Sequence, residues 1–125
     1  MNKYFNTTLG LSMLPDGNIS VGTLTAEEAA GWLRQEFENV ANPSHANTLD
    51  AVSRHLGVDV RQAKGGRIKL TAGDGCLVAE ISGVPRETRE FTDAEITAAT
   101  FTFRLVKVHE PDPLNFMADF ALKVL

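Results

Sequence analysis

One histidine stands at the predicted start of a short helix, in the segment Asn42-Pro43-Ser44-His45. Ser44 fits the N-cap position of that helix. A helix start presents unpaired backbone N–H groups and the positive end of the helix dipole, so it attracts anions such as phosphate. A histidine at this place can bind a phosphate or assist cleavage of a phosphodiester. The segment therefore predicts a site for a phosphate-bearing ligand.

The helix that follows is defined by its apolar residues and by its end. Leu49, Val52 and Leu56 recur on one face, which predicts a buried stripe. Gly57 is typical of a left-handed helix end. His55 lies late in the same helix, where a positive charge favours the C-terminal end of the dipole. We therefore expect His55 to stabilise the helix rather than to bind the ligand.

Polar residues elsewhere in the chain are further candidates for this site. Arg67 is either a phosphate ligand or a charge on an edge strand. A polar loop with two arginines and a glutamate either closes over a ligand or forms a solvated surface. The side chains that can bind a base or ribose also suit turns and caps. These loop and hydrogen-bonding candidates are Arg86, Glu87, Arg89, Asn6, Asn47 and Thr48.

Composition limits the class of protein. The 125 residues predict one domain, and a net charge of −4 argues against a general coat for DNA or RNA. Cys76 is the single cysteine, so no intrachain disulfide can form, and its spacing from the histidines fits no metal site. No cofactor is expected. Without a signal-peptide pattern or a long apolar run, we expect a cytoplasmic protein that does not enter membranes.

Periodicity and turn signals predict a single-domain α+β fold, in which a small, mainly antiparallel or mixed sheet carries helices on one side. We expect residues 1–108 to form the domain and residues 109–125 to be an amphipathic extension of it. An apolar tail of this kind is rarely solvated, so it should pack on the domain or on a second copy. The predicted strands are 3–14 and 19–23, joined as a hairpin, then 67–71, 76–81 and 100–108; the predicted helices start near Thr25, Pro43, Thr92 and Asp112.

The order of several short motifs resembles a known viral family. The segment from His45 to Gly57 resembles a Gly-His-x-Ser-Thr helix with the same distance to its closing glycine. Arg67-Ile68 resembles the start of an Asn-Arg-Ile strand, and Gly73-Asp74 resembles a Gly-Asp turn. Together with Tyr4-Phe5-Asn6-Thr7, these motifs are similar to those of the viral type III anti-CRISPR ring nucleases. The resemblance covers most of the chain, from residue 3 to about residue 108.

The resemblance implies a ligand and a set of roles. Ring nucleases of this family bind cyclic tetra-adenylate across a symmetric dimer. By position, His45 would be the acid, Glu87 its assistant and Arg67 a phosphate ligand, with no metal involved. Phe91 is a candidate to stack on a base. The expected ligand-binding residues are Asn6, Ser44, His45, Ala46, Asn47, Thr48, Arg67, Arg86, Arg89 and Phe91.

Two positions depart from the family pattern and bear on activity. Ser44 stands where the family has glycine, and Val84 stands where it has a loop arginine. These departures favour sequestration of an immune messenger, as in the anti-CBASS and anti-Thoeris sponges of phages, over its cleavage. The ligand would be a cyclic oligonucleotide or a cyclic ADP-ribose-like molecule, held by a homodimer or a higher homo-oligomer. The alternatives are a ring nuclease using His45 and a protein-interaction module without a nucleotide.

Overall fold

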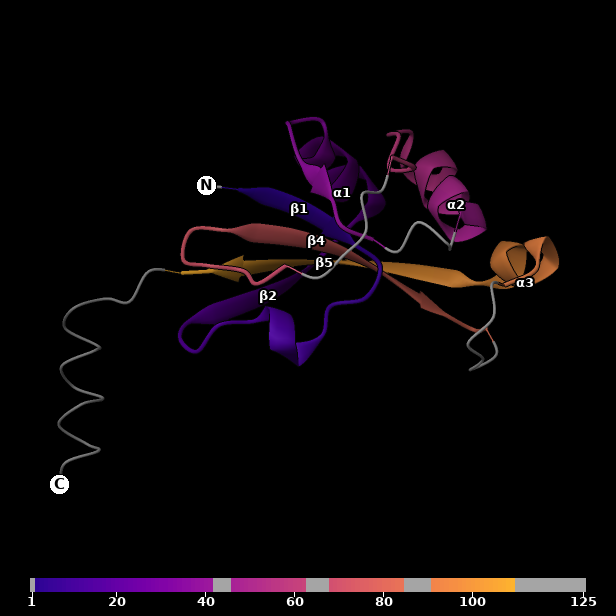
Figure 1. The fold of residues 1–125 in the computed structure, drawn as a ribbon. Helices are drawn as coiled ribbons and strands as arrows, with labels where there is room; N and C mark the ends of the chain where they lie inside the picture. Colours follow the sequence, from indigo (N-terminus) through magenta and orange to yellow (C-terminus); the bar gives the residue numbers. More distant parts are fainter. Residues whose placement is uncertain (1, 42–45, 63–67, 85–90, 110–125) are drawn as a thin grey trace, which may run out of the picture.

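A five-stranded mixed sheet forms the centre of the computed structural model, which describes residues 2–41, 46–62, 68–84 and 91–109. The strand order is β2-β5-β4-β1-β3 (Figure 1). β1 is parallel to both β3 and β4, whereas β5 is antiparallel to β4 and β2. The sheet therefore has a parallel half and an antiparallel half. The strands are β1 Lys3–Asn6, β2 Ile19–Leu24, β3 Glu38–Asn39, β4 Gly75–Ser82 and β5 Thr100–Val108.

Three α-helices accompany this sheet: α1 Ala26–Leu33, α2 Ala46–Leu56 and α3 Asp93–Ala98. Capping boxes fix where α1 and α3 begin, because the Thr25 and Thr92 side chains accept hydrogen bonds from the backbone N–H of Glu28 and Glu95. Figure 1 shows α1 and α2 over one face of the sheet and α3 at its end. The α+β fold class predicted from the sequence is confirmed.

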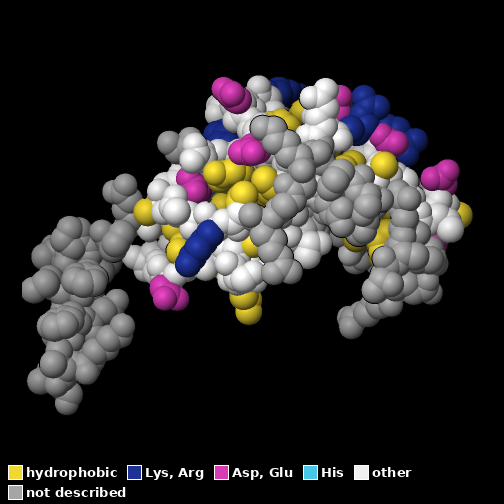
Figure 2. All heavy atoms as spheres, in the orientation of Figure 1, with side chains coloured by type: hydrophobic (Ala, Val, Ile, Leu, Met, Phe, Trp, Pro, Cys, Tyr) yellow, Lys and Arg dark blue, Asp and Glu magenta, His cyan; other side chains and the backbone are white. Residues whose placement is uncertain are grey.

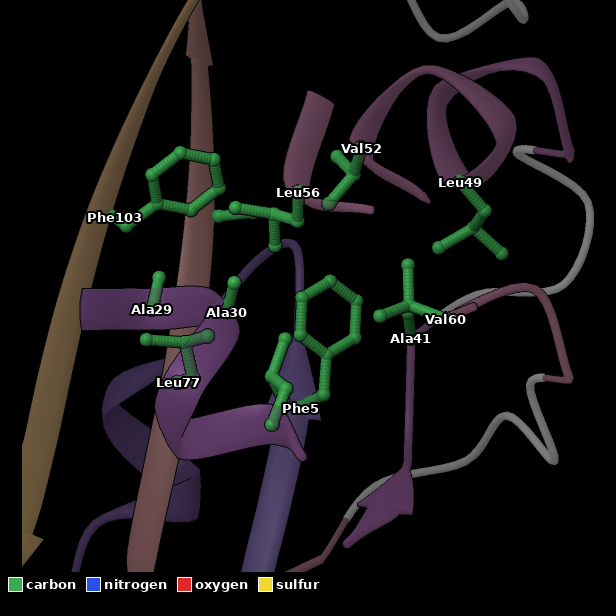
Figure 3. Packing of buried hydrophobic residues seen from close by; sticks show 12 residues of the cluster. Phe5, Ala29, Ala30, Ala41, Leu49, Val52, Leu56, Val60, Leu77 and Phe103 are labelled. Carbon is green, nitrogen blue, oxygen red and sulfur yellow. The ribbon is translucent and has the colours of Figure 1, made fainter. Parts of the chain in front are cut away.

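The main core lies between the sheet and the first two helices (Figure 3). Phe5 of β1 and Leu77 of β4 are fully buried beneath α1 and α2. Leu49 and Val52 on the inner face of α2 meet them, as the apolar stripe predicted. Burial of an aliphatic or aromatic side chain of this size contributes about 1.5–3 kcal/mol, so this cluster holds α2 in place.

Among the described residues, irregular chain rather than an α-helix covers the opposite face of the sheet. Cys76 and Val106 lie there with Leu70, packed against Leu14 and Ile19. A 3-10 helix, η1 Leu11–Met13, forms part of this cover. Loops thus complete the second layer.

The expected hairpin between residues 3–14 and 19–23 is wrong. β1 ends at Asn6, because the Asn6 side-chain carbonyl accepts hydrogen bonds from the backbone N–H of Thr7 and Thr8 and turns the chain. β2 then pairs with β5 along six residue pairs. The long strand β5 provides more pairing than a local hairpin, so a distant contact overrides the turn signal.

Two other predicted elements differ from the structure. The first helix ends at Leu33 rather than Phe37, and Phe37 instead packs edge-on against Phe5 with ring centroids 6.4 Å apart. Residues 68–71 are not a strand, and Arg67 lies outside the described residues. The Asp74 carboxylate accepts hydrogen bonds from the backbone N–H and the hydroxyl of Thr71, which holds this segment in a turn.

Candidate functional site

The carboxyl ends of three parallel strands meet at one edge of the sheet. β1 is paired in parallel with β3 on one side and with β4 on the other. The chain that follows β3 leads to the start of α2, and the chain that follows β4 leads to α3. In open α/β sheets, ligands bind outside the carboxyl ends of parallel strands, where successive connections diverge. The fold therefore places the predicted α2 site where such sheets carry ligands.

Two buried asparagines shape this edge. Asn6 ends β1, and its side-chain N–H also lies 3.9 Å from the Met13 sulfur. Asn39 ends β3, and its side-chain carbonyl accepts a hydrogen bond of 2.9 Å from the Ala41 N–H. The Asn39 amide donates to the Val60 carbonyl. Both side chains form hydrogen bonds with backbone groups. For Asn6 the sequence left two roles open, a turn and ligand binding, and the structure shows the turn.

The first turn of α2 contains the described part of the predicted site. Ala46 is exposed at the start of the helix. The Asn47 side-chain amide donates a hydrogen bond to the Phe91 carbonyl. Thr48 is 3% exposed, and its hydroxyl has no hydrogen-bond partner among the described residues. A buried hydroxyl without a partner costs about 1–3 kcal/mol, and a ligand oxygen or an ordered water can satisfy it.

The Asn47–Phe91 hydrogen bond brings two distant segments together. Asn47 belongs to the first turn of α2, and Phe91 directly precedes the Thr92 N-cap of α3. His45 is the residue before α2, and segment 85–90 ends immediately before Phe91. The Asn47–Phe91 hydrogen bond therefore joins two residues that adjoin, in the sequence, the segments with most of the predicted site residues.

Several predicted site residues lie outside the described residues, so their roles stay predictions. They are Ser44, His45, Arg67, Arg86, Glu87 and Arg89.

Another pocket lies away from the start of α2. It has a volume of about 1050 Å³ and lies beside β3 and the first residues of β1. Its charged lining residues are Lys3, Glu36, Glu38 and Asp59, so carboxylates predominate among them. Burial, followed by the Asp74 and Glu38 carboxylates, raises the pKa of Tyr4 in its wall. This acidic hollow is unsuited to phosphate.

In residues 2–41, 46–62, 68–84 and 91–109, no group of three histidine, cysteine or acidic side chains is placed to hold a metal ion. In the same ranges, no helix is both long and apolar enough to cross a bilayer.

The chain is similar to a known protein in fold, but not in any family pattern. No family model and no curated protein matches the sequence. The fold resembles that of B116 of Sulfolobus turreted icosahedral virus. The two share 20% sequence identity with a TM-score of 0.62, and the match covers 86% of this chain and 99% of B116. A small viral protein therefore has this fold. At that identity the match shows a shared fold alone. It does not support the narrower resemblance to ring nucleases.

Two features of this region could not be predicted from a continuous sequence pattern. Asn39 ends a strand of two residues, which is too short to produce a periodic pattern. A groove between α2 and α3 depends on Arg54 and Phe101, which are 47 positions apart in the sequence. The only local signal was the pair Arg54-His55 in the last turn of α2, which helix electrostatics already explains.

Proposed function

We propose that this protein is a viral counter-defence protein that binds and sequesters a cyclic-nucleotide-type immune messenger. The messenger would be a cyclic oligonucleotide or a cyclic ADP-ribose-like molecule. Its phosphates would lie on the backbone amides at the start of α2 and against Arg67. Arg86 or Arg89 would close over them, and a base would stack on Phe91. The site of action would be the cytoplasm of the infected cell.

The observation that supports this proposal most is the position of the α2 start. It lies at the carboxyl edge of the parallel strands, and Asn47 ties it to Phe91 at the end of the arginine-bearing loop. The open N–H groups of a helix start suit a phosphate. The buried Thr48 hydroxyl is a further donor in the same turn. The viral protein B116 has the same fold, which agrees with a viral origin.

Sequestration and cleavage differ in what the site must supply. Cleavage of a cyclic oligoadenylate needs a ribose 2′-hydroxyl in line with the phosphorus and an acid at the leaving oxygen, a role that falls to His45 with Glu87 assisting. General acid–base help from one histidine contributes a factor of about 10²–10⁴. Val84 occupies the place of the family's loop arginine, which favours sequestration. A ring nuclease is the second candidate.

A panel experiment tests both candidates. The full chain is incubated with cyclic di-, tri- and tetranucleotides and cyclic ADP-ribose isomers, then heated, and the released ligand is analysed by chromatography. We expect one messenger to bind with micromolar or tighter affinity and to be released intact. Linear fragments from the wild type, absent with His45→Ala, would make the protein a nuclease. His109→Ala, at an exposed histidine, is the matched control. No binding by any compound would refute the proposal.

A symmetric cyclic ligand is bound most simply by two copies related by a two-fold axis, since each copy presents the same groups. We therefore propose at least a homodimer, with residues 114–125 contributing to assembly or to the core. Light scattering on the full chain and on a chain ending at Val108 tests this. A full-length protein that stays monomeric at high concentration would refute the oligomer.

A further inference from the structure

Two adjoining hollows lie between α2 and α3. Their volumes are about 650 and 490 Å³, and both are lined by Arg54, Ile96 and Thr97. The first hollow also reaches Asn47, at the start of α2, and the second reaches Phe101 on β5. We call the two together the α2–α3 groove. It runs from the candidate site along the side of α2 to the last turn of this helix.

The charges along the groove are unevenly placed. In the first hollow, the Arg61 guanidinium lies 3.1 Å from the Asp59 carboxylate and 3.8 Å from that of Asp50. The space-filling view shows arginine or lysine and acidic side chains together over α2 (Figure 2). Arg54 has no ion pair among the described residues. The second hollow is lined by Arg54 and His55 and by no described carboxylate. Arg54 also lines the first hollow together with Asp50, Asp59 and Asp93, so an anion fits beside Arg54 only on the side of the second hollow.

An aromatic surface adjoins this cation. The His55 ring lies over the buried Phe103 ring, with centroids 5.8 Å apart and planes inclined by 29°. Phe101 is tilted against the same imidazole at 6.0 Å and 43°. His55 is exposed while Phe103 supports it from the core. A supported and exposed ring of this kind is a surface on which a planar base can stack.

We propose that the α2–α3 groove binds one nucleotide unit, with its base stacked on the His55–Phe101 pair and its phosphate beside Arg54. An arginine guanidinium pairs with phosphate oxygens through two parallel hydrogen bonds, and stacking on aromatic rings accepts any base. The proposal rests on the proposed function, because the groove is the path by which a messenger held at the start of α2 extends over the protein. The proposal gives Arg54 a contact with the ligand. This role goes beyond the favourable position of its positive charge in the last turn of α2.

Titration with 5′-AMP, followed by NMR on the labelled full chain, tests the groove directly. We expect shift changes centred on residues 54–57 and 96–101 that saturate with AMP. Arg54→Gln should weaken AMP binding at least tenfold, and His55→Leu should also weaken it. Arg54→Lys, which keeps the charge, should recover part of the loss. Arg34→Gln removes the same charge at the exposed C-cap of α1 and should leave AMP binding within twofold of wild type.

The outcomes separate this proposal from the proposed function. Shift changes confined to residues 46–49, with an affinity that Arg54→Gln does not alter, would overturn the groove and leave the α2 site intact. The absence of any AMP binding would also overturn it. Saturable AMP shifts in the groove that depend on Arg54 would support it, even if no cyclic nucleotide binds at the start of α2. That last result would refute the proposed function alone.

Discussion

The side-chain amide of Asn47 donates a hydrogen bond to the main-chain carbonyl of Phe91 and so fastens the first turn of α2 to the start of α3. The two residues are separated by 44 positions in the sequence. Each adjoins one of the segments that carry the predicted phosphate ligands. The start of α2 and the start of α3 are therefore coupled through one polar contact, and substitutions near it should affect both.

Substitution of Asn47 should separate these two segments. Asn47→Ala leaves the partly buried Phe91 carbonyl without its donor, so we expect the free energy of unfolding to fall by about 1–3 kcal/mol. Chemical denaturation measures this loss. Gln62→Ala, at an exposed amide side chain, is the control and should change stability little. An unchanged stability of Asn47→Ala would show that the contact does not hold the two segments together.

Thr48 allows the opposite test. Thr48→Val keeps the branched shape and removes a buried hydroxyl that has no partner among the described residues. We expect the free protein to keep its stability or to gain up to about 1 kcal/mol, because an unsatisfied polar group is removed. Binding of the messenger should weaken. A destabilisation by more than about 1 kcal/mol in denaturant titration would mean that the hydroxyl has a partner in the folded protein.

Two leucines with opposite environments test how α2 is anchored. Leu49 is 1% exposed in the core beneath α2, whereas Leu11 is 87% exposed. Leu49→Ala should cost about 2–5 kcal/mol through the lost burial and the cavity left behind. Leu11→Ala should cost little. Calorimetric unfolding of both variants compares them, and equal losses would contradict the placement of α2 on this core.

Cys76 should behave as an inert thiol. Burial raises the pKa of the Cys76 thiol from 9.0 to about 12. Since the unfolded chain loses this proton first, stability is present below about pH 9 and falls as the pH rises toward 12. Cys76→Ala should remove that part of the pH dependence.

Alkylation is the second measurement on this thiol. Iodoacetamide should modify Cys76 in denaturant and leave it unmodified in the native protein at neutral pH. Rapid alkylation of the folded protein would contradict its burial.

Local sequence signals determined the starts of α1 and α3, the end of α2 and the longest strand. Thr25 with Glu28 and Thr92 with Glu95 form capping boxes at two of the predicted helix starts, because a cap depends only on residues three positions apart. Gly57 ends α2 with a φ of +69°, as its place after the apolar stripe predicted. The alternating residues of β5 also marked a strand. These features could be predicted because the interacting groups are neighbours in the chain.

Strand pairing was decided only by the tertiary structure. Ile19–Leu24 pairs with β5 although a turn signal favoured pairing with the preceding residues, since strand partners compete over the whole chain. The two-residue β3 had no local pattern, and the α2–α3 groove depends on residues that lie far apart in the sequence. The sequence by itself predicted a phosphate site at the start of α2. Only the parallel arrangement of β1, β3 and β4 brought that start to the edge of the sheet, beside Phe91, because burial of the apolar faces fixes the order of the strands.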